Sequence, residues 1–394
     1  MLLSLALILL VSLLLSSLFI KLHIPSLIAM IFTGIILGPY VLNLISPNLL
    51  SISADLREIA LIVILLRAGL SLDLKDLKKV GRPAILLSFL PATIEILAIG
   101  FLAPIFFNIN LIDALLMGSI VAAVSPAIVV PKMIHLIESR QGTNKSIPQM
   151  VLAGASIDDI YVIVLFTSFL QISQGGTIGF STLLSLPISL LLGLIVGVSS
   201  GLLLIFIFKK FHIRDTVKVF IIFSFAFLLM FLEDSIKEYV PFSGLLGIMA
   251  LGGTILKQYP VLAKRLTVKF SKIWIGAEIM LFVLVGAIVD IRVLSNIGVL
   301  ALLLILLSLC MRMIAVQIAC IKTNLTLKEK IYVSFSYIPK ATVQAAIGAI
   351  PLSLGLSSGN LILTVAVLSI LFTAPLGAIL MDRTSKQLLF TEPQ

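Results

Sequence analysis

Two adjacent aspartates in the middle of an apolar segment are the residues of this chain best suited to chemistry. The segment VLAGASIDDIYVIVLF places Asp158 and Asp159 about ten residues into an apolar run of about 25. A charge at the centre of a bilayer costs about 2.5–3.5 kcal/mol on insertion scales, so it rarely persists without a use. Burial and a charged neighbour both disfavour the ionised form of a carboxyl group. Such a pair can hold protons near neutral pH and release them to a small hard cation.

Three further charged residues fall within apolar segments: Glu95, Arg312 and Lys340. A buried acid and a buried base usually pair, so Glu95 and Arg312 form the expected structural ion pair. Lys340 is expected to offset either the carbonyl end of a broken helix or an ionised Asp158. The competing interpretation is that the aspartate pair is structural and is itself neutralised by these bases. Spacing alone leaves the pairing open.

Two apolar segments contain a proline near their middle. One reads MGSIVAAVSPAIVVPKM and contains Ser125-Pro126, and the other reads VSFSYIPKATVQAAIGAI and contains Pro339-Lys340. Proline removes a backbone donor and clashes with the preceding turn, so we expect a helix break at Pro126 and at Pro339. A single proline in a membrane helix often produces only a kink. The freed carbonyls, with the hydroxyl groups of Ser125 and Ser156, are expected to complete a cation site around the aspartates.

The composition predicts an all-α polytopic membrane protein. Of 394 residues, 60% are hydrophobic and only 12% are charged, and the mean hydropathy is +1.23, which excludes a soluble globular chain. No polar segment is long enough for a separate soluble domain, so residues 1–394 are expected to form a single membrane transporter domain. About thirteen transmembrane helices are predicted, at 2–20, 24–43, 54–70, 83–107, 111–134, 148–172, 181–208, 216–233, 241–257, 271–290, 294–320, 329–351 and 359–381.

The positions of the two proline breaks predict inverted repeats. The breaks fall in the fifth and twelfth spans, which are seven spans apart and therefore cross the membrane in opposite directions. We expect one repeat over about 1–172, a linker helix over about 181–208, a second repeat over about 216–381 and a short cytoplasmic tail over 382–394. Two broken helices that cross at the midplane are typical of secondary transporters.

The basic residues predict the orientation of the chain. Loops after the odd-numbered spans contain 22 of the 28 Lys and Arg residues, and the other loops contain only Arg57, Lys237 and Arg292. This asymmetry indicates a cell (plasma or inner) membrane protein with its amino terminus outside and its carboxyl terminus in the cytoplasm. The net charge of +10 then describes the cytoplasmic face and does not indicate a nucleic-acid partner.

The combination of three motifs resembles the cation:proton antiporter superfamily. The motifs are ASIDD, SPAIVVPKM and YIPKATVQAA, and LLRAGLSLDL after the third span adds to the likeness, which is greatest to the NHA-type sodium/proton antiporters. The likeness extends from the second span to the thirteenth. It implies a homodimer in which each protomer has a dimerisation domain and a mobile core domain that carries the ion by an elevator-like movement.

The resemblance also implies roles for individual residues. It marks Asp159 as the main ion and proton ligand with Asp158 beside it, Glu95 and Arg312 as a buried salt bridge, and Lys340 as the base at the second broken helix. The chain departs from the eukaryotic members of this group in the G-A-x-V segment, where Ile288 occupies a position that is acidic in those relatives.

The expected function is therefore secondary active exchange of sodium or lithium for protons, by alternating access, without enzymatic activity and without a cofactor. Proton-coupled potassium efflux is an alternative because it uses the same parts. A sodium-coupled organic-anion symporter is less well supported because it needs a polar substrate cavity. A prenyl-transfer enzyme needs two Asp-rich motifs, and this chain has one. Two aspartates favour two protons per sodium, whereas a Glu95–Arg312 bridge favours one-for-one exchange.

Overall fold

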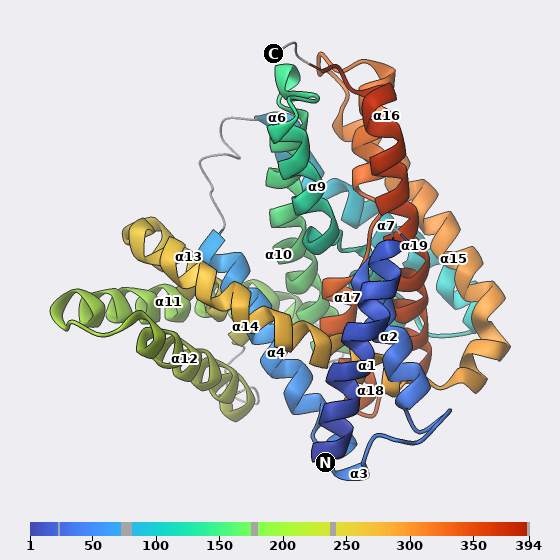
Figure 1. Cartoon of the computed structure of the whole chain (residues 1–394). Helices are drawn as coiled ribbons and strands as arrows, with labels where there is room; N and C mark the ends of the chain where they lie inside the picture. The colour runs from blue at the N-terminus through green and yellow to red at the C-terminus, as the bar shows by residue number, and fades with distance from the viewer. Residues whose placement is uncertain (23, 72–80, 175–179, 237–241, 392–394) are drawn as a thin grey trace. The chain divides into compact units, whose positions relative to one another are not determined.

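The chain is helical throughout the part that the structure describes. The computed structural model describes residues 1–22, 24–71, 81–174, 180–236 and 242–391 (Figure 1). Within these ranges there is no strand, and one isolated bridge pairs Gln141 with Thr391. The all-α prediction is confirmed. The helices are α1 (Leu2–Lys21), α2 (Ser26–Leu37), α3 (Pro47–Ser51), α4 (Ser53–Ser71), α6 (Arg82–Leu87), α7 (Leu90–Phe107), α8 (Leu111–Ala122), α9 (Pro126–Glu138), the 3-10 turn η1 (Thr143–Lys145), α10 (Ile147–Ser173), α11 (Phe180–Lys210), α12 (Asp215–Ile236), α13 (Gly244–Gln258), α14 (Pro260–Ala287), α15 (Ile291–Ala319), α16 (Leu327–Ser336), α17 (Thr342–Ile347), α18 (Ile350–Ser353) and α19 (Gly359–Leu388).

Each of the thirteen predicted spans contains at least one of these helices. Among the described residues, nine helices are long and apolar enough to cross a membrane, and α2, α13 and the stretch Thr342–Ser353 are shorter apolar helices. The apolar runs predicted the helices because a segment in lipid must satisfy its backbone hydrogen bonds, and a helix does so within the segment itself.

Three predicted boundaries are wrong, and two of the errors arise at prolines. The span at 24–43 stops being helical at Leu37, because Pro39 forces Gly38 into an extended conformation with ψ 173°. The span at 271–290 begins much earlier, because Pro260 starts α14 at its first position. The basic residues Lys264, Arg265, Lys269 and Lys272 therefore lie on the first turns of α14. The third error is the span at 359–381, which continues as a helix to Leu388 and so into the stretch predicted as a tail.

The helices group into two compact units that are interleaved in the sequence. Unit 1 contains α1, α2, α3, α6, α7, α8, α9, α10 up to Phe169, α14 from Ile279, and α15 to α19. Unit 2 contains α4 from Asp55, the end of α10, α11, α12, α13 and α14 up to Glu278. This grouping is not the division into repeats, which remains a prediction.

Unit 1 contains both broken helices. Within it, α7 packs against α8 and α15, and α19 packs against α15 and α16, while α17 contacts α8 and α19 (Figure 1). Figure 1 also shows that α1 begins and α19 ends at opposite ends of this unit. In unit 2, α11 packs closely on α13. The absence of a Cβ atom at Gly197 makes this possible, since a Cβ atom there would overlap the carbonyl oxygen of Gly247. Close approach at glycine is the usual way in which membrane helices pack tightly.

Candidate ion-binding site

The two proline-containing helices are broken where the sequence predicts, and the two breaks touch. Residues between Ala122 and Pro126 separate α8 from α9, and residues around Pro339 separate α16 from α17. The backbone N–H of Ser125 donates to the carbonyl oxygen of Pro339 at 2.8 Å. Segments more than 200 residues apart in the sequence therefore cross directly at their non-helical parts.

Side chains from other helices donate hydrogen bonds to the backbone carbonyl groups at the end of α8. Gln344 Nε2 donates to the carbonyl oxygens of Val121 at 3.1 Å and Ala123 at 2.8 Å. Arg312 Nη1 donates to the carbonyl oxygen of the residue between them, Ala122. A helix end leaves its last carbonyls without intrahelical partners, and here three consecutive ones are satisfied by side chains. The sequence argument missed Gln344, whose only signal is its place in the YIPKATVQAA motif.

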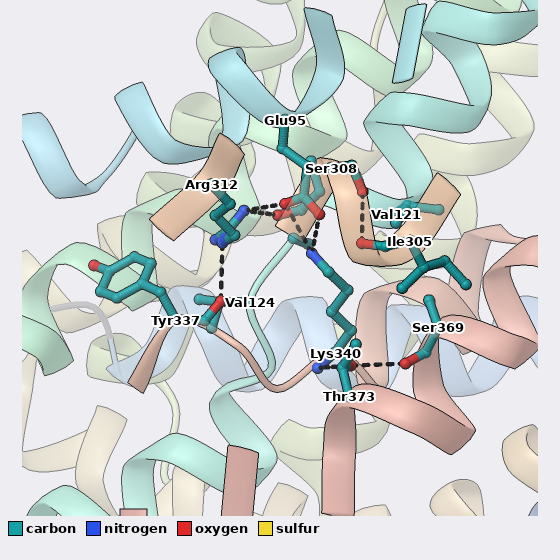
Figure 2. Close-up of polar contacts among 12 residues, drawn as sticks. Glu95, Val121, Val124, Ile305, Ser308, Arg312, Tyr337, Lys340, Ser369 and Thr373 are labelled. Atoms are coloured by element: carbon teal, nitrogen blue, oxygen red, sulfur yellow. Dashed lines mark hydrogen bonds and ion pairs between the residues drawn. The ribbon is translucent and has the colours of Figure 1, made fainter. Parts of the chain in front are cut away.

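Glu95 accepts from both buried bases. Arg312 Nη1 lies 2.8 Å from Glu95 Oε2, so the expected ion pair is present. Lys340 Nζ lies 2.8 Å from each oxygen of the same carboxylate. Figure 2 shows the two cationic groups directed at the Glu95 carboxylate, and all three side chains have an exposed fraction of zero. The backbone N–H of Lys340 donates to Thr373 Oγ1 at 3.0 Å, which fixes the start of the lysine side chain.

Arg312 connects this pair to the aspartates. Its Nη2 lies 3.3 Å from Asp158 Oδ2, and its Nε donates to the carbonyl oxygen of Tyr337 at 2.9 Å. The same Asp158 oxygen accepts the backbone N–H of Val124 at 2.8 Å, from the first break. The pairing that spacing left open is therefore resolved. Arg312 bridges Glu95 and Asp158, and the hydrogen-bonded partner of Lys340 is Glu95.

Asp159 differs from Asp158 in that no described base lies within ion-pair distance of it. Asp158 is fully buried and Asp159 is 8% exposed. Among the described residues no ion pair involves Asp159, and the Oδ1 atoms of both aspartates lack a hydrogen-bond partner. The network contains three carboxylates and two bases, so one carboxylate has no matching cation. Because Glu95 and Asp158 contact the two bases, the carboxylate left over is that of Asp159.

The two predicted hydroxyl ligands have different outcomes. Ser125 is fully buried, and its Oγ has no hydrogen-bond partner in the part of the chain that the structure describes. The side chain of Ser156 lies outside the described residues. The described residues contain no group of three or more His, Cys, Asp or Glu side chains suited to a metal ion.

The helices have the antiporter fold of a multi-pass membrane protein. The structure is similar to two structures of the sodium proton antiporter MjNhaP1 from Methanocaldococcus jannaschii. One has a TM-score of 0.81 at 21% identity and covers 98% of this chain and 97% of the other. The second has a TM-score of 0.73 at 24% identity and covers 99% and 98%.

Sequence comparison identifies the family. A family profile described as sodium/hydrogen exchanger, transmembrane, matches residues 5–382. Human sodium/hydrogen exchanger 9B2 is 33% identical over 387 residues, which cover 93% of this chain and 70% of that protein. Human sodium/hydrogen exchanger 9B1 is 31% identical over 357 residues, which cover 86% and 67%. The chain belongs to the sodium/hydrogen exchanger family, whose members are transporters and not enzymes.

Proposed function

We propose that this protein exchanges sodium or lithium for protons by alternating access at a site formed by Asp159 with Asp158 beside it. The observation that carries the proposal is the unmatched carboxylate of Asp159. An ionised carboxylate that is buried without a partner is costly, so it must bind either a proton or a cation. A group that alternates between these two partners is the minimum required for exchange.

The two ligands compete for one place. When Asp159 is ionised, its oxygens, the free Oδ1 of Asp158 and the Ser125 hydroxyl offer hard oxygen ligands to a small cation. When Asp159 is protonated, those ligands lose the charge that attracts the cation. The carbonyls of Val121 and Ala123, which were expected to complete the cation shell, already accept hydrogen bonds from Gln344. They therefore contribute less than the sequence suggested.

The charge count supports one-for-one exchange. Arg312 and Lys340 offset Glu95 and Asp158, and Asp158 is held by Arg312 as well as by the Val124 amide. Only Asp159 then remains to change its occupant between a proton and a cation. One sodium for one proton moves no net charge, so we propose an electroneutral cycle.

We propose that a movement of unit 1 exposes the site to each side of the membrane in turn. Every described residue of the network lies in unit 1, so that unit can carry the whole site as one body. We extend the proposal to a homodimer in the cell membrane, with the amino terminus outside and the carboxyl terminus in the cytoplasm. The homodimer and the elevator-like movement rest on the resemblance described above, and the orientation rests on the distribution of basic residues.

The direct test is cation-induced dequenching of a pH-sensitive dye in proteoliposomes. Sodium, lithium and potassium are added separately between about pH 6.5 and about pH 9, to wild type and to Asp159→Asn. We expect a sodium or lithium response that the substitution abolishes. A response to potassium alone would show that the transported cation is potassium and would leave the proposed mechanism unchanged. If none of the three cations produced dequenching while a control antiporter was active, cation/proton exchange would be rejected and a sodium-coupled symporter favoured.

A further inference from the structure

Gln344 is the one uncharged side chain that joins the two broken helices by a pair of hydrogen bonds within the described crossing. It lies on α17 and is 1% exposed. Its Nε2 donates to Val121 and Ala123 on the other broken helix, and its Oε1 has no partner among the described residues. The orientation of the amide group follows from its surroundings, because the opposite orientation would direct an oxygen at two carbonyl oxygens.

These two hydrogen bonds hold the end of α8 at a buried position where water cannot replace them. An unmade hydrogen bond of a buried carbonyl costs about 1–3 kcal/mol, so the α8 end is well satisfied only while Gln344 is in place. Arg312 satisfies the intervening carbonyl of Ala122, but Arg312 is also engaged with Glu95 and Asp158. Gln344 is therefore the contact to this helix end that is independent of the ion-pair network.

The segment that Gln344 holds leads directly into the ion site. The next residue after Ala123 is Val124, whose N–H donates to Asp158. Ser125 follows, whose N–H donates to Pro339 and whose hydroxyl has no partner among the described residues. Ala123, whose carbonyl oxygen accepts from Gln344, is thus directly followed by Val124, whose N–H donates to Asp158. A shift of the 121–125 segment would move the Asp158 donor and the Ser125 hydroxyl together.

We infer that Gln344 is a positioning residue for cation binding, which keeps the Val124 amide and the Ser125 hydroxyl in register with the aspartate pair. This inference rests on the proposed function and adds a specific residue to it. The action of Gln344 passes through the backbone of residues 121–125, because its nitrogen donates to two carbonyl oxygens of that segment. Misplacement of a binding group by about 1 Å is enough to weaken a site strongly.

The test compares Gln344→Met with Gln317→Met. Methionine has nearly the shape of glutamine and lacks its donors. Gln317 is a matched control, because its Nε2 also joins two helices, donating to the carbonyl oxygen of Lys330 at 3.1 Å and to Ser334 Oγ at 2.8 Å away from the crossing. We expect Gln344→Met to raise the apparent KM for sodium about tenfold, with kcat within about twofold of wild type. Gln317→Met should leave both constants near wild type.

A second variant and a second measurement keep the inference testable whether or not the protein transports. Gln344→Glu keeps the length of the side chain and replaces the donor by an acceptor, so its KM should rise at least as much as that of Gln344→Met. Hydrogen exchange of a peptide covering residues 118–130 should become faster in both Gln344 variants and stay unchanged in Gln317→Met. Failure of wild type to exchange cations would reject the proposed function, and the hydrogen-exchange result would still decide the positioning role. An unchanged KM and unchanged exchange in folded Gln344 variants would overturn the inference.

Discussion

The guanidinium group of Arg312 lies 3.3 Å from the carboxylate of Asp158, and both side chains have an exposed fraction of zero. This contact separates two adjacent aspartates that look equivalent in the sequence. Asp158 is tied to a network that also satisfies Glu95, whereas Asp159 has no described base and remains the group able to change its occupant. The predictions below test that difference and its consequences.

Substitution of the two aspartates should have opposite effects on stability. Asp159→Asn removes a buried carboxylate without a partner, so we expect transport to fall about 100-fold or more while Tm stays unchanged or rises. Asp158→Asn leaves Arg312 with one carboxylate fewer and should lower Tm. Thermal unfolding in detergent, with transport in proteoliposomes, measures both quantities. Equal losses of Tm in the two variants would contradict the distinct roles of the aspartates.

The two bases should differ in their importance for stability. Arg312→Met leaves Asp158 without a cation and frees the carbonyls of Ala122 and Tyr337, so we expect a destabilisation of about 3–5 kcal/mol. Lys340→Met leaves Glu95 paired with Arg312 and should cost less, about 1–3 kcal/mol. The Tm values of the two variants test this order of stability. A larger decrease in Tm for Lys340→Met would show that Arg312 is not the centre of the network. Arg312→Lys should not rescue, because an ammonium group cannot bridge two carboxylates and two carbonyls in the same geometry.

Competition between protons and sodium at one carboxylate predicts a specific pH dependence. Below the pH at which the site becomes half protonated, each unit of acidification should raise the apparent KM for sodium about tenfold, because ten times more sodium is then needed to displace the proton. Saturating sodium should restore the same maximal rate. Initial rates measured over a grid of pH and sodium concentration test this. A maximal rate that falls with acid while KM stays constant would indicate separate sites for the two ions.

The sequence predicted the charged residues of the site because charge in a bilayer is costly and therefore conspicuous. It predicted the breaks at Pro126 and Pro339 for a similar reason, since a proline inside an apolar run has a defined backbone effect. It predicted the Glu95–Arg312 pair, but it did not predict that Arg312 also contacts Asp158 or that Lys340 pairs with Glu95, because Glu95 and Lys340 are separated by 245 residues. Such pairing depends on how α7, α15 and the second break approach one another.

Other features left weak signals or none. Gln344 was missed because an uncharged amide in an apolar run is inexpensive, and nothing local shows that its partners are two carbonyls on another helix. Helix existence was predictable from apolar runs, but the ends at Leu37 and Pro260 depend on the prolines at 39 and 260, which a hydropathy average does not weigh. The Ser156 prediction stays untested because that side chain lies outside the described residues.

A glycine one turn before the aspartates should matter for the position of Arg312. A Cβ atom at Gly154 would overlap the hydroxyl oxygen of Tyr337 and lie 3.0 Å from Leu87 Cβ. Tyr337 would have to move, and its carbonyl oxygen accepts from Arg312 Nε. We expect Gly154→Ala to lower Tm and to raise the KM for sodium several-fold, although alanine alone favours a helix by about 1 kcal/mol. Gly276→Ala is the matched control, since a Cβ atom there would meet no atom within 4 Å, and it should be neutral or stabilising.

The charge count makes a final prediction about the membrane potential. Two bases offset Glu95 and Asp158, so one exchangeable carboxylate binds one sodium or one proton, and no net charge crosses in a cycle. Rates in proteoliposomes should then be the same whether a potassium diffusion potential is imposed in either direction or abolished. An exchange of two protons for one sodium would move one charge per cycle, for which each 100 mV supplies about 2.3 kcal/mol, and would respond strongly. Asp158→Asn separates the two schemes further. If Asp158 carried a transported proton, the substitution would abolish the response to potential and keep exchange, whereas in the proposed cycle exchange is weakened and no response to potential exists to be lost.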